Sequence, residues 1–365
     1  MSIIIAIIVF SIIIIVHELG HFFAAKKCGI RVEEFSVGMG PLIVSKKRGE
    51  TEYSLRAFPI GGYCKMQGEM DDEEYSDMVD PDYEKSRSFN QKSVMQKIGV
   101  IFAGPAMNFV LAFILVFILL GVNGFLVPEI NSVVENSPAY EAGLQAGDKI
   151  VKVNGERISI YQDYYVALAT RNSDSAVDMT VSRDGEKISV SITPEYSEET
   201  GRYMLGFSFD GRYGLFSDEI EGYERSSIIE TIKTDIGMMA YFVKSVVSGL
   251  VQLFTFQVKS EDVSGPIGII NTIGDTYEAG MVYGVKDAIL NLFALSALLS
   301  TNLGVFNLFP IPAVDGGRLA FLIVEGIRKK PVNPETEGKI HLVGYVMLMV
   351  FMAFIAFNDI VNLVR

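Results

Sequence analysis

The chain has 365 residues, of which 49% are hydrophobic, and its mean hydropathy is +0.32. Soluble proteins of this length are usually less apolar, so the composition indicates a membrane protein. The formal net charge of -13 argues against a nucleic-acid partner, because proteins bind phosphates through clustered Lys and Arg. Cys28 and Cys64 form no CxxC pair, so we expect neither a disulfide framework nor a cysteine-ligated metal.

Four apolar segments are long enough to cross a bilayer, because about 20 helical residues span a hydrocarbon core of roughly 30 Å. They are Ile3 to Phe23, Ile98 to Val122, Ala288 to Phe309, and Leu342 to Val361. The first has neither the basic start nor the cleavage site of a signal peptide, so we expect it to remain as a helix. The sequence therefore predicts a polytopic α-helical membrane protein with four transmembrane helices.

A stretch rich in glycine and proline, Phe35 to Gln67, follows the first span. Its strands, such as Thr51 to Phe58, alternate apolar and polar residues, and the pairs Gly40-Pro41 and Gly61-Gly62 separate them. This pattern indicates a β-hairpin structure. The acidic run Asp71 to Glu74 lacks the spacing and the glycine turn of an EF-hand, so we expect a solvated loop there.

A polar stretch between the second and third spans predicts a small β-rich domain at residues 128–212. The turn dipeptides Asn154-Gly155 and Asp184-Gly185 favour tight hairpins. Apolar and polar residues alternate most clearly in three segments: Lys149 to Val153, Met179 to Ser182, and Lys187 to Ile192.

Two segments of this domain resemble PDZ domains. Asn136 to Ile150 is similar to their helix-and-strand core, and Leu205-Gly206-Phe207 is similar to their carboxylate-binding loop. The loop comes at the end of the domain, which resembles the permuted strand order of bacterial protease PDZ domains. We therefore expect one inserted PDZ domain that binds substrate through Leu205, Gly206 and Phe207.

An amphipathic pattern from Ser226 to Phe256 predicts a further helix, whose first half is too polar for us to expect it to span. The chain is then divided into four parts. Residues 1–127 and 286–365 form the two halves of a membrane core, residues 128–212 form the PDZ domain, and residues 213–285 form the amphipathic helix and a linker.

Basic residues follow the first and third spans, which predicts that these two loops are cytoplasmic. They are Lys26, Lys27, Arg31, Lys46, Lys47 and Arg48, and then Arg318, Arg328, Lys329, Lys330 and Lys339. The N-terminus, the PDZ-like domain and the C-terminus are then expected on the outer side.

The first span carries the motif His17-Glu18-Leu19-Gly20-His21. Histidines four residues apart project from one face of a helix and can bind a single Zn²⁺, with Glu18 next to the metal. Zinc lowers the pKa of a bound water from about 15.7 to roughly 7, and a neighbouring carboxylate can take its proton. Because ionisable groups inside a membrane are costly, we interpret the motif as a catalytic zinc site.

A catalytic zinc usually has three protein ligands, so a third is needed. His341 is one candidate, but we expect it in a polar loop before the fourth span, as an interfacial histidine. Asp315 is the better candidate, because it follows the third span in a segment where Pro310 and Pro312 break the helix. An ordinary turn aspartate before Gly316-Gly317 is the alternative interpretation of Asp315.

Taken together, these features resemble the site-2 protease family of intramembrane metalloproteases, specifically its regulator of sigma-E protease branch in bacteria. The resemblance covers nearly the whole chain in order. Its segments are His17 to His21, Phe58 to Tyr63, Ala103 to Asn108, Gly265 to Gly268, Asn307 to Gly316, and the PDZ insertion.

The resemblance implies that Asp315 is the third zinc ligand, that Glu18 is the base, and that Asn307 lies near the substrate backbone. It also implies that the hairpin is membrane-associated and pairs with an unwound substrate strand, a role we assign to Gly61 and Gly62. Two prolines of the broken segment are further expected to contribute to substrate binding, Pro310 and Pro312.

The resemblance also implies an integral protein of the bacterial cytoplasmic (inner) membrane, with its active site near the cytoplasmic side. Its expected substrates are single-span membrane proteins, either anti-sigma factors or remnant signal peptides, and the membrane lipid surrounds it. The sequence departs from the family pattern at two points. Val314 stands where leucine is usual, and one PDZ unit is found where the best-known members have two, which puts substrate filtering in doubt.

Two other functional classes fit the sequence less well. A PDZ-bearing scaffold or inactive relative would not need the intact motif and Asp315. A metal transporter would need ionisable residues through several spans, whereas the second span has none and the fourth has only Asp359 near its end. Asn108 in the second span could bond to the active-site helices or pack against a neighbouring helix, and the sequence favours neither.

Overall fold

The computed structural model describes residues 2–69, 84–169, 174–198, 201–216, 223–255, 257 and 265–364. The acidic run Asp71 to Glu74 lies outside these residues. Contacts divide the chain into two compact units, one of residues 1–115 and 242–365 and one of residues 116–241. The expected PDZ region lies within the second unit, and the four-part division stays a prediction.

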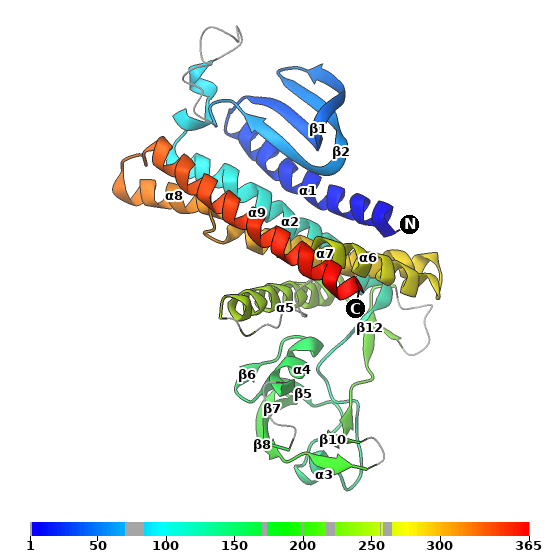
Figure 1. Ribbon diagram of the computed structural model, residues 1–365. Coiled ribbons are helices and arrows are strands. Elements are labelled where there is room, and N and C mark those ends of the chain that lie inside the picture. Colours follow the sequence, from blue (N-terminus) through cyan, green and yellow to red (C-terminus); the bar gives the residue numbers. More distant parts are fainter. Residues whose placement is uncertain are drawn as a thin grey trace. The chain divides into compact units, whose positions relative to one another are not determined.

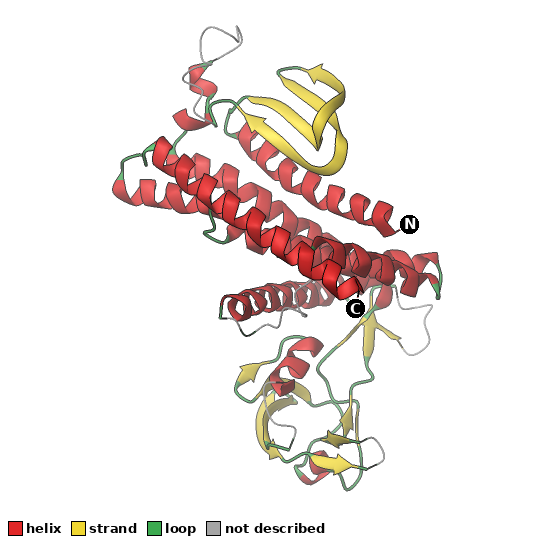
Figure 2. Ribbon diagram, in the orientation of Figure 1, coloured by secondary structure: helices red, strands yellow, loops and turns green. Residues whose placement is uncertain are grey.

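Long helices make up most of the first unit (Figures 1 and 2). They are α1 (Ser2–Lys27), α2 (Val94–Asn123), α5 (Ile228–Phe254), α6 (Pro266–Met281), α7 (Val285–Leu308), α8 (Asp315–Arg328) and α9 (Pro334–Val364), of which α2 and α5 also contribute to the second unit. Each of the four expected spans is helical.

Five described helices are long and apolar enough to cross a membrane: α1, α2, α5, α7 and α9. The expected count of four therefore stays a prediction. One expectation was wrong, since His341 lies within α9 and not in a loop. Pro334 begins this helix with Glu335 and Glu337 in its first turn, where carboxylates favour the positive end of the helix dipole.

The helix α6 packs against α1 and α7. Ile273 of α6 is buried with Ala6, Val9 and Ile13, which lie in the N-terminal half of α1. Gly280 allows a close approach to α7, because a Cβ there would lie 2.4 Å from Ala288 Cα. The region around residues 213–285, expected as one helix and a linker, thus contains a second helix.

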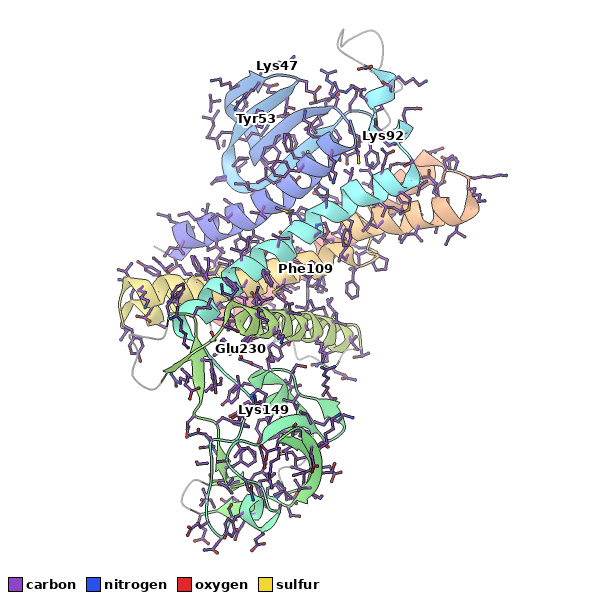
Figure 3. All side chains as sticks on the ribbon, turned by 180° about the vertical axis from the view of Figure 1, so that it is seen from behind. Lys47, Tyr53, Lys92, Phe109, Lys149 and Glu230 are labelled. Carbon is purple, nitrogen blue, oxygen red and sulfur yellow. The ribbon has the colours of Figure 1, made fainter. Side chains whose placement is uncertain are left out.

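The hairpin β1 (Val32–Arg48) and β2 (Thr51–Met66) lies beside α1 (Figure 1). Its strands fold over, so that the segment from Glu34 to Val37 pairs with Tyr53 to Leu55 on one side and with Gly62 to Cys64 on the other. The Gly62 half of β2 is therefore an edge of this curled sheet within the described residues. Tyr53, labelled in Figure 3, packs near Phe22 of α1.

The hairpin is followed by two 3₁₀ turns, η1 (Lys85–Arg87) and η2 (Phe89–Gln91). Arg87 forms an ion pair with Glu50 at the hairpin turn, and Lys26 at the end of α1 contacts the same carboxylate. The hydrogen bond from Arg87, assisted by Lys26, lowers the pKa of Glu50 to about 2. These charges tie the hairpin to the end of α1.

The second unit contains the β-rich domain. Its largest sheet has the order β6-β5-β7-β8, with β5 (Lys149–Val153), β6 (Glu156–Arg157), β7 (Val177–Arg183) and β8 (Glu186–Ile192). All three segments with alternating residues are strands. Asn154, Gly155, Asp184 and Gly185 have positive φ, as the tight turns between β5 and β6 and between β7 and β8 require.

Shorter elements complete this unit. They are β3 (Phe125–Leu126), β4 (Ser132–Val133), α3 (Pro138–Glu141), α4 (Tyr161–Ala169), β9 (Glu195–Ser197), β10 (Arg202–Met204), β11 (Phe207–Ser208), β12 (Arg212–Gly214) and β13 (Tyr223–Arg225). Ile150, Met179 and Val181 lie in a core that also includes Tyr164 of α4. The strand β11 pairs with β4, so the Leu205–Phe207 segment is part of the fold.

Candidate metal centre

His17 and His21 lie one turn apart on α1, and both are buried, at 7% and 6% exposure. Their Nε2 atoms are 3.2 Å apart. Glu18, between them in sequence, is half-buried. The expected projection of the two histidines from one helix face is confirmed.

Asp315 comes to the same place from the far end of the chain. Its Oδ2 is 3.1 Å from His17 Nε2 and 3.4 Å from His21 Nε2. This oxygen is buried and has no hydrogen-bond partner. Among the described residues, these three side chains form one group of potential metal ligands.

The three ligand atoms fit a zinc ion. Nitrogen and oxygen atoms placed about 2.0–2.1 Å from a tetrahedral zinc are roughly 3.3 Å apart, and the three separations here range from 3.1 to 3.4 Å. Two imidazoles and one carboxylate also form a donor set that catalytic zinc sites use, with a fourth position left for water.

Two glycines, one on each helix, allow α2 to pack closely against α1 at this site. A Cβ on Gly104 would lie 2.3 Å from His21 Nε2, and a Cβ on Gly20 of α1 would lie 2.2 Å from Ala103 O. Only the absence of side chains at both positions allows α1 and α2 to approach so closely. Neither Gly20 nor Gly104 was expected at the site from the sequence, although both lie in segments that carry the family resemblance.

The outer nitrogen of each histidine also meets α2. His21 Nδ1 is 2.9 Å from Val100 O, and His17 Nδ1 is 3.1 Å from Asn108 Nδ2. Val100, Gly104 and Asn108 are spaced four residues apart and so share one face of α2. Val100 and Asn108 on this face contact the two Nδ1 atoms, while Gly104 lies against His21 Nε2 and His17 Cε1.

The segment that carries Asp315 is compact. The helix α7 ends at Leu308, and α8 begins at Asp315 after the two prolines. A Cβ on Gly316 would lie 1.9 Å from Phe309 O, and one on Gly317 would lie 2.5 Å from Ile311 O. The Gly-Gly pair therefore permits α8 to begin directly against the preceding loop, which fixes where Asp315 points.

The helix α9 supports the same loop. The N–H of Ala313 donates to His341 Nδ1 over 3.0 Å, and Ala313 has a positive φ of 82°. Gly344 lets α9 approach Pro312, since a Cβ there would lie 2.4 Å from Pro312 Cβ. His341 is thus a neighbour of the loop rather than a metal ligand, a role that its sequence position did not indicate.

Two ion pairs hold α8. Arg318 donates to the side chain of Glu69 over 2.5 Å and to its backbone oxygen over 2.9 Å. Lys97 of α2 pairs with Glu325 at 3.0 Å. Both pairs connect α8 to segments that also contact α1, so the first turn of α8 is fixed relative to the two histidines.

The hairpin edge approaches Glu18. A Cβ on Gly62 would lie 3.7 Å from Glu18 Cγ, and Ser11 of α1 donates to Pro59 O over 2.7 Å. Gly61 has a positive φ of 91°. The structure thus brings the Gly61-Gly62 pair, expected from the sequence, beside the central carboxylate of the motif.

The other expected substrate-binding residues lie in α7, in the loop after it and in the second unit. Asn307 lies half-buried in the last turn of α7, and Pro310 and Pro312 lie in the loop after it. Leu205, Gly206 and Phe207 belong to the second unit. Their part in substrate binding stays a prediction.

Comparison with known proteins covers almost the whole chain. The model of peptidase family M50 matches residues 5–351. A candidate zinc metalloprotease of Clostridium acetobutylicum is 36% identical over 361 residues, covering 99% of this chain and 97% of its own. The regulator of sigma-W protease RasP of Bacillus subtilis is 30% identical over 430 residues, covering 98% of this chain and 97% of its own. The solved PDZ domain of an SdrC-like protein from Listeria monocytogenes matches 24% of this chain and 86% of its own length, with 19% identity and a TM-score of 0.20.

Proposed function

This chain belongs to peptidase family M50 and is a zinc metalloprotease, and from this premise we propose that His17, His21 and Asp315 hold its zinc ion. The observation that carries the proposal is the convergence of three ligand atoms at 3.1 to 3.4 Å from segments almost 300 residues apart in sequence. Glu18 is then the general base.

Zinc, when bound, supplies the Lewis acidity that activates water and polarises a peptide carbonyl. Glu18 accepts the proton of the attacking water and passes it to the leaving amine, as a general base and then a general acid do. The two histidines remain neutral, because a ligating imidazole needs a free lone pair at Nε2. The buried position of both rings limits access of bulk water to the site.

The bond that is cut lies in a transmembrane segment. The motif is on an apolar helix, and ionisable residues inside a membrane are costly enough that function is their usual explanation. A helical substrate hides its carbonyls in internal hydrogen bonds, so it must unwind locally before hydrolysis. An extended segment could then add to the free edge of β2 at Gly62, beside Glu18.

Other residues contact the unwound substrate in this proposal. Gly61 and Gly62 offer backbone groups at the sheet edge, while Asn307 offers an amide near the end of α7. Pro310 and Pro312 shape the loop on the other side of the site. The Leu205–Phe207 segment in the PDZ-like domain binds a polar part of the substrate outside the membrane.

The substrates are single-span membrane proteins, of the anti-sigma factor or remnant signal peptide type. RasP of Bacillus subtilis, which resembles this chain along its length, is named a regulator of sigma-W protease, and this supports the first type. A shortened outer part would let such a segment reach the hairpin edge. The cleavage site then lies near the cytoplasmic face of the bacterial inner membrane.

Four crossings agree best with the site. Asp315 follows the C-terminal end of α7 and meets the C-terminal half of α1, so those two ends lie on the same side of the membrane. With α1 and α2 antiparallel crossings, the chain leaves α2 and enters α7 on the other side. The region between them therefore crosses an even number of times, and α5 cannot cross alone.

The helix α6 does not provide the missing return. Its 16 residues extend about 24 Å, less than the roughly 30 Å hydrocarbon core, and they pack on the N-terminal half of α1. We therefore place α5 along the membrane surface. With Lys26 and Lys27 on the cytoplasmic side, the PDZ-like domain lies outside.

The test compares cleavage of a model single-span substrate by the purified wild-type protein, Glu18→Gln and Asp315→Asn, with zinc content measured in all three. We expect Glu18→Gln to keep zinc and to lose at least about a hundredfold in rate. Asp315→Asn should lower zinc occupancy. Unchanged cleavage by Glu18→Gln would refute the base, and full occupancy in Asp315→Asn would refute the ligand.

A further inference from the structure

Asn108 lies at the centre of the interface between α1, α2 and α7. Its side chain is completely buried, at 0% exposure. Its backbone oxygen accepts a hydrogen bond from Ser300 of α7 over 2.9 Å. Its side-chain Nδ2 is 3.1 Å from His17 Nδ1, while its Oδ1 is buried and has no hydrogen-bond partner. A buried amide oxygen without a partner is uncommon and calls for an explanation.

The tautomer of His17 explains this unpartnered amide oxygen. If Nε2 of His17 binds zinc, as proposed above, the ring carries its proton on Nδ1. Nδ1–H is then a donor, and the Nδ2 group of Asn108 is also a donor. Two donors would face each other over 3.1 Å while the Oδ1 acceptor stays unused.

Reversing the side-chain amide replaces the contact between two donors with a hydrogen bond and gives Oδ1 a partner. Nitrogen and oxygen of an Asn amide have nearly the same shape, so hydrogen bonding must decide which is which. In the reversed orientation Oδ1 occupies the position next to His17 Nδ1. We propose that Asn108 Oδ1 accepts a hydrogen bond from His17 Nδ1–H and is a positioning residue for this zinc ligand.

The second histidine has a matching arrangement. His21 Nδ1 is 2.9 Å from Val100 O, and a backbone oxygen can only accept. One face of α2 thus provides an acceptor for each imidazole, a carbonyl for His21 and a carboxamide for His17. Both rings are then held with Nε2 toward Asp315. This inference rests on the proposed zinc site, because only metal binding at Nε2 requires the proton on Nδ1.

The test uses Asn108→Asp, Asn108→Leu and, as a matched control, Ser300→Ala. The aspartate offers oxygen on both sides and cannot donate when ionised, whereas leucine has similar volume and no acceptor. Ser300→Ala removes a buried hydrogen bond to the same residue but leaves its side chain intact. Zinc affinity is measured by chelator competition on the full-length protein in micelles, alongside the absorption spectrum of the Co²⁺-loaded protein and the thermal unfolding of the zinc-free form.

We expect Asn108→Leu to bind zinc about 10- to 100-fold more weakly and to show an altered Co²⁺ spectrum. Asn108→Asp and Ser300→Ala should bind within about threefold of wild type. Equal losses in the aspartate and leucine variants would overturn the proposal, because they would mean that Asn108 acts as a donor. Wild-type affinity in Asn108→Leu would overturn it as well.

Two further outcomes are distinguishable. If the zinc-free leucine variant fails to fold, the aspartate variant decides alone, since a donating amide predicts that it loses zinc affinity. Asp315→Asn is measured in parallel. Loss of zinc in that variant with wild-type affinity in Asn108→Leu would reject only the role of Asn108, whereas no change in either would reject the metal site itself.

Discussion

Single residues set the geometry of the proposed zinc site, both by the side chains they contribute and by the side chains that glycines lack. Gly104 is opposite both imidazoles, and the nearest imidazole atom would lie 2.3 Å from a Cβ there. That separation is far below van der Waals contact, and a Cβ on Gly20 of α1 would likewise meet the backbone of Ala103. The size of the side chain at position 104 is therefore restricted as strictly as the chemical identity of the side chains at His17 and His21.

Replacing Gly104 by alanine should lower the rate of proteolysis about a hundredfold. The new methyl group must displace His21 Nε2, and misplacement of a reacting group by about 1 Å costs roughly a hundredfold in rate. We expect zinc content to fall together with cleavage of a model substrate. Gly99→Ala, in the same helix and with open space at its Cβ, is the control and should keep both. Wild-type cleavage by Gly104→Ala would show that the two helices approach less closely.

A second prediction concerns pH and the β-rich domain. Arg183 binds both oxygens of Asp148, each at 2.7 Å, and the N–H of Gln145 donates to the same carboxylate. Burial alone would raise the pKa of Asp148, but these hydrogen bonds hold that pKa below its usual range. Because the folded pKa is depressed, the carboxylate stabilises the domain above the unfolded pKa of about 3.9, and this contribution is lost as pH falls through the folded value.

Asp148→Asn should therefore destabilise the domain by about 2 kcal/mol at pH 7, since hydrogen bonds to a charged group are lost. The difference from wild type should shrink as pH is lowered below about 4. Amide hydrogen exchange of β5 and β7 in the full-length protein measures it. Glu186→Gln, an exposed site on β8, is the control. A difference that stays constant down to pH 2 would argue against the ion pair as the cause.

At the level of elements, the proposed zinc site depends on the end of α7, because the loop after it leads to Asp315. The helix α7 ends at Leu308, and the chain crosses a short loop before α8 starts at Asp315. The prolines explain the interruption, because they lack the N–H that a continued helix would need. The position of the loop is set by α9, through His341 and the contact of Gly344 with Pro312.

His341→Leu should lower cleavage about tenfold while α9 remains helical. The N–H of Ala313 loses its acceptor, and a part-buried donor without a partner costs about 1–3 kcal/mol, which loosens the loop that carries Asp315. Cleavage rate and zinc affinity measure the effect. Glu337→Gln, which removes a charge 3.9 Å from His341 without touching Ala313, should behave as wild type. Equal effects in the two variants would point to electrostatics instead of the hydrogen bond.

At the scale of the whole molecule, the zinc site constrains topology. Five helices of the described residues are apolar and long enough to span, yet Asp315 can meet His17 and His21 only if the chain between α2 and α7 crosses an even number of times. Hydropathy is calculated for each helix separately, so it contains no information on the number of crossings. The restriction to an even number follows because residues far apart in sequence meet at the same depth in the membrane.

Cysteine labelling tests the proposed placement of α5. In a background of Cys28→Ser and Cys64→Ala, single cysteines are introduced at Ser227 and Gln257, on either side of α5, and at Lys46 on the hairpin. All three positions are exposed. A membrane-impermeant thiol reagent applied to intact cells should label the first two and not the third. Labelling at only one end of α5 would show that this helix crosses the membrane.

The sequence alone predicted the chemistry of the proposed site. His17, Glu18 and His21 were identifiable because a helix places residues i and i+4 on one face, and the apolar segments and the β alternation were identifiable because they too are local periodicities. Asp315 was only a candidate for the third ligand, because its separation from the motif in sequence says nothing about their distance in space. Asn108 remained undecided for the same reason.

Only the tertiary structure decided which distant groups meet. It brought Asp315 within 3.1 Å of His17, moved His341 from an expected loop into α9, and showed that α2 faces both imidazoles with Val100, Gly104 and Asn108. These contacts depend on how closely the helices pack. Close packing is possible because glycines, which have no side chain, stand where the helices meet, and these glycines are far apart in the chain. Local patterns therefore predict the zinc-binding helix, whereas packing between helices determines the completed site.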